Sequence, residues 1–462
     1  MVIRTLRLAA LTVFLLLVAA ACATLPDTDA LIERHGRQAA RFENARGALS
    51  AQKSAIIVAA LKRSSGDLDI LDKQIALEQA IVGSALILGN KVSLLQDGTA
   101  TYAAMFAAIR RARDHINLET YVFEDDEVGR QFADLLLVQQ GRGVQVNVIY
   151  DSVGAVNTPE AFFARLRHGG IEVLEFNPVN PLAAKKSWLL NNRDHRKLLV
   201  VDGQTAFIGG INISSVYSSG SGARRSRKAA DNTLVWRDTD LQIEGPVVAE
   251  LQRQFLDTWK KQRGPPLLPK AYFPELKERG KDIVRAIGST PDDPYSLFYL
   301  TLISAIGNAE KQINLTHAYF VPDPQLLKSL IDAAGRGVEV TLILPSRSDS
   351  ELVFHAGRSH YSILLKAGVK IYERRDALLH AKTVSIDGVW SSIGSSNLDW
   401  RSFLDNDEIN AVVLGHEFAR QMQTMFAKDL EASEKIDPAH WERRSPLLRV
   451  KEWGASLLQR LL

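Results

Sequence analysis

Apolar residues follow two different rhythms along this chain, and the change from one to the other falls at about residue 86. From residue 23 to 85 they recur at helical spacing in a segment rich in Ala, Leu, Arg and Gln, which predicts a helical N-terminal region. Beyond it, short β-branched runs such as Val144–Tyr150 alternate with helical stretches. This alternation is typical of an α/β architecture.

The alternating part of the chain contains an internal repeat. Ile116–Leu118 recurs as Ile313–Leu315, and Gly141–Val144 recurs as Gly335–Val338. Each copy predicts the same order of helices and strands, so two copies of one fold lie in tandem. The sequence therefore divides into repeat 1 over residues 86–262, a Pro-rich linker over 263–294, repeat 2 over 295–430 and an amphipathic tail over 431–462.

The first 22 residues have the pattern of a secretory signal. Arg4 and Arg7 precede an apolar run, Leu8–Val18, that is too short to span a bilayer comfortably. Cys22 follows three alanines and resembles the cysteine of a bacterial lipobox, although Ala19 stands where Leu is usual. We expect Cys22 to be the lipidation site of an exported, membrane-associated lipoprotein on the periplasmic side or in the cell envelope. A plain signal peptide or an uncleaved anchor is the alternative, and each would place the chain at a membrane.

The composition excludes several kinds of site and one class of partner. The chain has 462 residues, enough for a large core, and one cysteine. One cysteine cannot form an intrachain disulfide, a Cys-type zinc site or an iron–sulfur centre. A net charge of +3 does not indicate a nucleic-acid binder, so no nucleic-acid partner is expected.

The tail predicts an amphipathic helix. Leu447, Val450, Trp453, Leu457 and Leu461 recur at helical spacing, with cationic residues between them. Such a helix suits the interface of a membrane. Docking of the same apolar face on the protein's own core is the equally supported alternative.

Each repeat ends in the same constellation of a histidine, a lysine, an aspartate and a short segment from glycine to asparagine, at identical spacing. The residues are His195, Lys197, Asp202 and Gly209–Asn212 in repeat 1, and His380, Lys382, Asp387 and Gly394–Asn397 in repeat 2. A strand is favoured at each lysine, and residues two apart on a strand face the same side. The histidine and lysine of each copy should therefore project into one site.

This constellation resembles the H-x-K-x4-D motif of the phospholipase D superfamily, and both copies are intact. The resemblance implies tandem duplicated phospholipase D-like α/β/α sandwich domains with one active site at their interface, each motif supplying half of that site. Further segments in both copies resemble those of bacterial cardiolipin synthases: Glu119–Phe123, Arg237–Leu241, Tyr319–Pro322 and Ser396–Asp399.

Phosphodiester chemistry explains why two motifs are needed. A phosphate anion repels an incoming nucleophile, so cationic or hydrogen-bonding donors must neutralise its oxygens. We expect that role for Lys197 and Lys382, supported by Asn212, Asn397 and Ser395. One neutral imidazole can then attack phosphorus while the other, protonated, donates to the leaving alcohol. The resemblance implies His195 as nucleophile and His380 as general acid and base, with no metal or other cofactor.

A nucleophilic histidine also needs a carboxylate that orients its ring. The resemblance implies this role for Glu408, which opens a strand-like run after the second motif, and we expect Asp240 to do the same in repeat 1. The resemblance puts the motif residues Asp202 and Asp387 in the catalytic set, yet each precedes a glycine where a strand turns back. A structural turn, or a contact with the lysine, is at least as well supported for them as direct chemistry.

The resemblance thus implies a phosphatidyltransferase like cardiolipin synthase, which transfers a phosphatidyl group to phosphatidylglycerol through a phosphohistidine intermediate. The alternatives are a phospholipase D that forms phosphatidic acid, a nuclease of the superfamily, and a lipid-binding lipoprotein with a vestigial site. The expected partners are a phospholipid substrate and a membrane surface, and the expected state is a monomer. An insertion at Ser218–Asp231 carries four cations and is either a solvated loop or an attractor of anionic lipid head groups.

Overall fold

The computed structural model describes residues 41–65, 74–75, 84–179, 191–219 and 235–462. These ranges include both motifs and the whole of the C-terminal tail. The signal and lipobox segment with Cys22 lies outside the described residues, as does nearly all of the cationic insertion.

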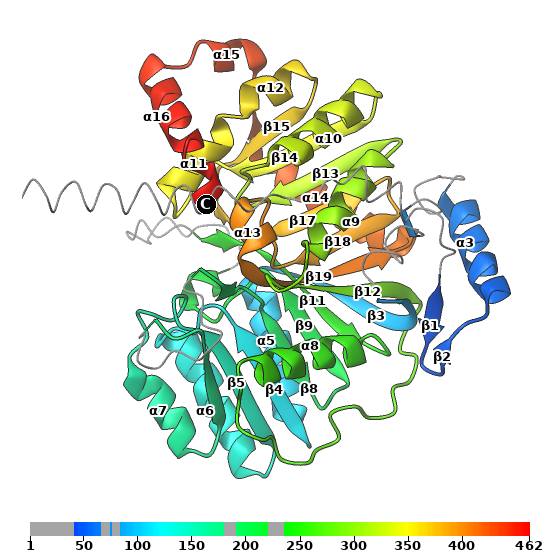
Figure 1. Cartoon of the computed structure of the whole chain (residues 1–462), viewed down its shortest axis with the longest axis vertical. Coiled ribbons are helices and arrows are strands. Elements are labelled where there is room, and N and C mark those ends of the chain that lie inside the picture. Colours follow the sequence, from blue (N-terminus) through cyan, green and yellow to red (C-terminus); the bar gives the residue numbers. More distant parts are fainter. Residues whose placement is uncertain (1–40, 66–73, 76–83, 180–190, 220–234) are drawn as a thin grey trace, which may run out of the picture.

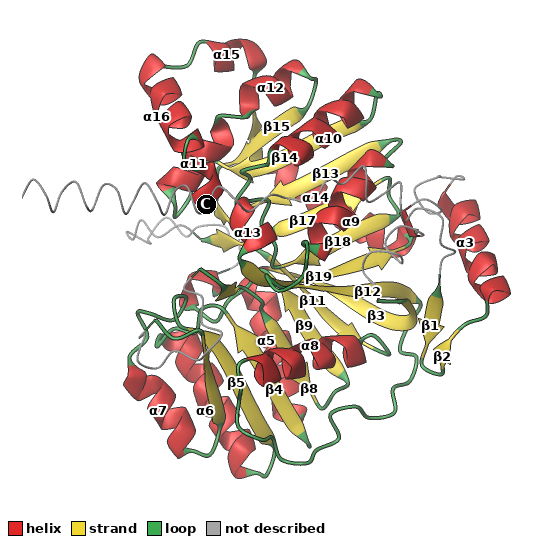
Figure 2. Ribbon diagram, viewed as in Figure 1, coloured by secondary structure: helices red, strands yellow, loops and turns green. Residues whose placement is uncertain are grey.

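Repeat 1 is a twisted mixed sheet with helices on both faces, as Figures 1 and 2 show in the lower half of the view. Its strands, in spatial order, are β3 (Leu86–Gln96), β11 (Thr239–Glu244), β9 (Thr205–Gly209), β8 (Leu198–Val201), β4 (His115–Thr120), β5 (Gln145–Asp151) and β6 (Glu172–Phe176). The last three run parallel, because helices connect them. Its helices are α5 (Asp97–Arg111), α6 (Glu127–Gly141), α7 (Glu160–His168) and α8 (Val248–Lys261).

Repeat 2 has the same sheet order, which confirms the predicted duplication. Its strands are β12 (Asp282–Ser289), β19 (Asn406–Leu414), β18 (Trp390–Gly394), β17 (Lys382–Ile386), β13 (Gln312–His317), β14 (Glu339–Pro345) and β15 (Lys370–Arg374), with β20 (Ser433–Lys435) added at the edge. Its helices are α9 (Leu297–Gly307), α10 (Pro324–Gly335), α11 (Glu351–Arg358), α12 (Tyr361–Lys366), α13 (Trp400–Leu404) and α14 (His416–Glu431).

The two sheets join through their first strands. β12 pairs antiparallel with β3, so the repeats form one continuous sheet. A buried core lies along this junction and takes Phe255 from α8 and Met422 from α14. β12 belongs to the stretch that the sequence predicts as a Pro-rich linker, so that prediction is wrong for residues 282–289. The prolines lie on either side of this strand, whose own residues are proline-free.

The two ends of the chain also differ from expectation. The predicted helical N-terminal region contains α3 (Ala51–Ser65), but β1 (Phe42–Asn44) and β2 (Gly47–Ala48) precede it, and β1 adds to the edge of β3. The tail forms α15 (Pro438–Glu442), α16 (Pro446–Ser456) and a final 3-10 turn, η3 (Gln459–Leu461), so the predicted helix ends earlier than its apolar pattern. No helix in the described ranges combines the length and the apolar character that a membrane span requires.

Candidate active site

Short strand pairs between the repeats fix the two motif histidines. β7 (Arg193–Asp194) pairs with the start of β19, and β10 (Trp236–Arg237) pairs with β16 (Leu378–Leu379). The backbone N–H of His195 therefore donates to the carbonyl of Asp407 at 2.9 Å, and that of His380 donates to the carbonyl of Arg237 at 2.8 Å. Each histidine is thus held by backbone from the other repeat.

The carboxylate beside each motif histidine also comes from the other repeat. Glu408 of repeat 2 lies against His195 of repeat 1, with its two oxygens 3.0 and 3.1 Å from Nδ1. Asp238 of repeat 1 lies against His380 of repeat 2, with Oδ2 2.6 Å from Nδ1. A carboxylate at Nδ1 fixes the tautomer and leaves Nε2 available. Neither repeat could therefore complete its own histidine.

Glu408 lies where the sequence predicts it, but Asp240 does not take the matching role. Asp240 is two residues further along β11, which carries it about 7 Å deeper into the sheet. There it accepts a hydrogen bond from the backbone N–H of Ile211 at 3.1 Å and contacts neither histidine. Asp238, at the entrance to the strand, is the residue that does. The insertion at 218–231 hides this equivalence, because it interrupts the spacing that otherwise matches the two copies.

A sequence difference between the two motifs supports the pairing of Asp238 with His380 and of Glu408 with His195. Gly210 and Ser395 occupy the same position in the two motifs. A Cβ atom on Gly210 would overlap Oδ1 of Asp238, so a larger residue would collide with the carboxylate. Ser395 instead donates its hydroxyl to Glu408 and accepts from the backbone N–H of Ile409 at 2.9 Å. Ser395 therefore orients the carboxylate of Glu408.

The two motif lysines are buried beside the histidines. Lys197 donates to the carbonyl of His195 at 2.6 Å, and its Nζ lies 5.2 Å from the centre of the Tyr121 ring. Lys382 donates to the carbonyl of His380, and its Nζ is 3.0 Å from Nδ1 of the same residue. Each lysine therefore contacts the histidine of its own motif, through the backbone carbonyl in repeat 1 and through both ring and carbonyl in repeat 2.

Burial and mutual repulsion shift the pKa values of this cluster. Burial is the main cause that lowers the pKa of His195 to about 4, with Lys197 adding to it and Glu408 opposing it. Burial also lowers the pKa of Lys197 to about 7 and lowers those of His380 and Lys382. Burial alone would raise the pKa of Glu408, but His195, Lys197 and the Ser395 hydroxyl together lower it to about 2. His195 is therefore a neutral imidazole beside an ionised carboxylate at neutral pH.

The two motif asparagines line the pocket that contains both motif histidines. Asn212 accepts from the backbone N–H of Val122 at 3.2 Å and donates from Nδ2 to the hydroxyl of Tyr217 at 3.0 Å. The backbone N–H of Asn397 donates to the Ser402 hydroxyl at 3.1 Å. The side-chain oxygen of Asn397 has no hydrogen-bond partner among the described residues. Both asparagines thus lie in the wall of the pocket that holds His195 and His380.

The motif aspartates are remote from this cluster, which corrects their assignment to the catalytic set. Asp202, with a φ of 54°, accepts hydrogen bonds from the backbone N–H groups of residues 113, 114 and 115 at 2.8–3.1 Å. Asp387, with a φ of 53°, does the same for residues 310–312. Each ties a β-turn to the start of β4 or β13. Of the interpretations that the sequence leaves open, the geometry supports the structural turn.

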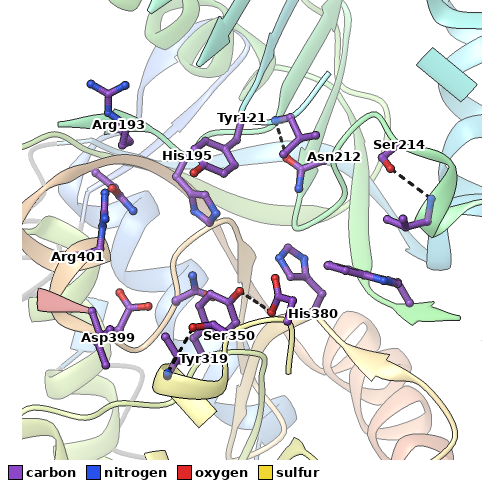
Figure 3. Close-up of a pocket in the computed structure, with 18 of the residues that line it drawn as sticks. Tyr121, Arg193, His195, Asn212, Ser214, Tyr319, Ser350, His380, Asp399 and Arg401 are labelled. Atoms are coloured by element: carbon purple, nitrogen blue, oxygen red, sulfur yellow. Dashed lines mark hydrogen bonds between the residues drawn. The ribbon is translucent and has the colours of Figure 1, made fainter. Parts of the chain in front are cut away.

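A pocket of about 470 Å³ contains both histidines and draws its walls from both repeats, as Figure 3 shows. Its two ends differ. Beside His380 lie aromatic rings, with Trp236 at 5.2 Å and Tyr217 at 5.8 Å between ring centres. On the His195 side lie the guanidinium-bearing residues Arg193 and Arg401. The walls around the duplicated motifs therefore differ in Trp236, which lies beside His380, and in Arg193 and Arg401, which lie on the His195 side.

Sequence reasoning did not single out several residues of the pocket wall. The ring of Tyr121 lies 5.1 Å from that of His195, and the ring of Tyr319 lies 6.5 Å from that of His380. Both tyrosines occur in the segments that resemble cardiolipin synthases, which could have marked them. Trp236 and Arg193 could not have been found in that way. Within the described part of the chain, no three His, Cys, Asp or Glu side chains are grouped as they would be around a metal ion.

Comparison with known proteins agrees with this geometry. A family model described as "Cardiolipin synthase, PLD-like domain" matches residues 105–259 and 302–430. The chain is 35% identical over 378 residues to a cardiolipin synthase of Geobacillus thermodenitrificans, covering 81% of this chain and 73% of the relative. It is 36% identical over 375 residues to cardiolipin synthase A of Pseudomonas putida, covering 80% and 74%. The fold is similar to that of a phosphatidylserine synthase from Haemophilus influenzae, with a TM-score of 0.58, 13% identity and coverage of 80% and 95%.

Proposed function

The chain belongs to the family of cardiolipin synthases with a phospholipase D-like domain, and we propose that it transfers a phosphatidyl group to a hydroxyl of phosphatidylglycerol through a phosphohistidine intermediate. Its general activity is that of a phosphatidyltransferase of the phospholipase D superfamily. The observation that carries the finer proposal is the pair of histidines in one pocket, each with its own carboxylate and lysine.

The first half-reaction forms the covalent intermediate. Nε2 of His195 attacks the phosphorus of the donor phospholipid, and the bond from phosphorus to the head-group oxygen breaks. His380 gives its proton to that oxygen, so that the head group leaves as a neutral alcohol. Lys197 and Lys382 neutralise the negative charge that gathers on the non-bridging oxygens, and the amides of Asn212 and Asn397 add hydrogen bonds.

The second half-reaction reverses these roles. A hydroxyl of phosphatidylglycerol attacks the phosphorus of phosphatidyl-His195 and passes its proton to His380, while the bond from nitrogen to phosphorus breaks. With phosphatidylglycerol as donor, the products are cardiolipin and glycerol. One phosphodiester replaces another, so the exchange needs no nucleotide.

The choice of His195 as nucleophile has support from its environment as well as from the family resemblance. A nucleophile must be neutral at the working pH; the lowered pKa of His195 meets this requirement, but that of His380 is lowered too, so the choice rests on the carboxylate that holds His195. Glu408 holds Nδ1 and is itself held by Ser395, so the positive charge that forms on the ring during attack meets an oriented carboxylate.

The substrates place the reaction at a membrane, and we propose that the chain works as a monomer on the membrane surface. We also propose that Cys22 is lipidated and that the protein is exported from the cytoplasm. Cys22 lies outside the described residues. Mass spectrometry of the protein isolated from membranes would test them: a diacylated N-terminal cysteine is the expected result, and an intact Met1 would contradict it.

Incubation of the purified protein with phosphatidylglycerol labelled in its head group and its acyl chains tests the transferase. We expect cardiolipin and free glycerol in equal amounts, with none from the His195→Asn or His380→Asn variants. Asp202→Asn serves as the matched control, because it alters a motif residue outside the pocket. Phosphatidic acid as the sole lipid product would mean hydrolysis by a phospholipase D and would overturn the proposal.

A further inference from the structure

The end of the chain presents an apolar face to solvent. Leu447, Val450, Trp453 and Leu457 are between 62% and 66% exposed, and Leu461 is 43% exposed. These are five of the large apolar side chains that folding leaves in water, and they are successive positions of one segment, α16 and η3. A continuous apolar surface of this kind marks an interaction site.

The opposite side of α16 is anchored, so the exposed face has a fixed orientation. Glu452 is 2% exposed and accepts from Arg444 at 2.8 and 2.9 Å. It also lies 3.7 Å from Arg358 of α11, and Ala455 packs with Val353 of the same helix. Figure 1 shows α16 beside α11, with the C-terminus next to them. The sequence leaves open whether the apolar face docks on the protein's own core or on a membrane. In the structure that face is exposed, and α16 packs on the protein through its opposite side.

The exposed face leads directly to the active-site pocket. Leu461 and Leu462 line the pocket that holds His195 and His380. The carbonyl of Leu462 accepts from the backbone N–H of Arg401 at 3.0 Å, which ties the end of the chain to α13. The segment that carries the exposed apolar residues therefore ends in the wall of the pocket.

The charge of this segment narrows the choice of partner. Residues 441–462 carry five arginines and lysines against two glutamates, and one of those glutamates is the buried Glu452. Arg449 and Lys451 are exposed on α16. A tryptophan and leucines bordered by cations are the side chains that bind an anionic membrane interface, where each cation adds about 1 kcal/mol.

We propose that the exposed face of α16 and η3 is the membrane-docking surface of the enzyme and that it places the mouth of the pocket against the bilayer. The inference rests on the proposed function, since a lipid substrate is what makes contact at this mouth useful. Trp453 and Leu457 would enter the interface, and the leucines at the chain end would cover the acyl chains of the lipid that enters the pocket.

The test compares three full-length proteins on two forms of phosphatidylglycerol. The proteins are wild type, the double variant Trp453→Glu with Leu457→Glu, and the control Leu268→Glu, which changes a 58% exposed leucine between the repeats. The substrates are mixed vesicles of phosphatidylglycerol and phosphatidylcholine, and short-chain phosphatidylglycerol below its aggregation concentration. The rate is measured as the loss of phosphatidylglycerol, so it does not depend on which product forms. The fraction of protein that sediments with the vesicles is measured in the same samples.

We expect the double variant to lose about tenfold or more of its rate on vesicles at limiting lipid and most of its co-sedimentation, because two apolar anchors are lost. Its rate on the short-chain lipid should equal that of wild type, and the control should match wild type throughout. Equal rates and binding on vesicles would overturn the docking surface, as would an equal loss on both substrates. A change from dimer to monomer in the double variant alone, with unchanged vesicle activity, would assign the face to a second copy instead. Phosphatidic acid in place of cardiolipin would defeat the proposed function and leave this comparison valid.

Discussion

Each motif histidine depends on one carboxylate from the other repeat, and this dependence can be tested one residue at a time. Asp238→Asn should lower kcat by roughly 1,000-fold, because the amide no longer fixes the tautomer of His380. Asp240→Asn makes the same chemical change two residues away, where no histidine is in contact, and should retain kcat within a few-fold. Equal losses in the two folded variants would contradict the assignment of Asp238.

The lysines predict how activity depends on pH. In the proposed mechanism both His380 and Lys197 act in their protonated forms, and burial lowers the pKa of each, that of Lys197 to about 7. The fall of kcat/KM with rising pH should therefore include a step near pH 7 that belongs to Lys197. A guanidinium stays charged at every accessible pH, so Lys197→Arg should move the alkaline limb of the profile to higher pH. An alkaline limb that does not move in this variant would show that another group controls it.

At the scale of elements, the motif aspartates close the turns that lead into β4 and β13. Asp202→Ala would leave three backbone N–H groups without their acceptor and put an alanine at a φ of 54°. We expect the free energy of unfolding in urea to fall by about 2–4 kcal/mol, with kcat per folded molecule within twofold of wild type. Loss of kcat at unchanged stability would return Asp202 to the catalytic set.

Some strands could be predicted from the sequence and others could not. The strands that carry the motifs could be predicted, because the period of two and the repeated spacing agree there. β12 could not be separated from the prolines around it, although Asp282–Ser289 holds the β-branched residues of a strand. β1 and β2 are only three and two residues long; β1 forms because it pairs with β3, and β2 pairs with β1. Such elements depend on tertiary contacts that a local pattern does not contain.

At the scale of the whole molecule, duplication explains why the site could be found so nearly complete. Two copies of one motif predict two histidines, two lysines and two asparagines, and all six belong to the cluster described above. The residues that surround the two motifs have diverged. The aromatic end of the pocket at Trp236 and the cationic end at Arg401 therefore could not be inferred by comparing one repeat with the other. Exchange of carboxylates between the repeats was equally hidden, because it depends on how the two sheets join at β3 and β12.

The covalent intermediate is the central claim, and trapping it is the most direct test. Full-length protein would be mixed with phosphatidylglycerol radiolabelled at phosphorus, quenched at neutral to alkaline pH during turnover, and mapped by peptide. The account predicts label on the peptide that contains His195, and transfer of that label into cardiolipin when unlabelled phosphatidylglycerol is added before the quench. Formation of cardiolipin at the normal rate with no label on either histidine would contradict it.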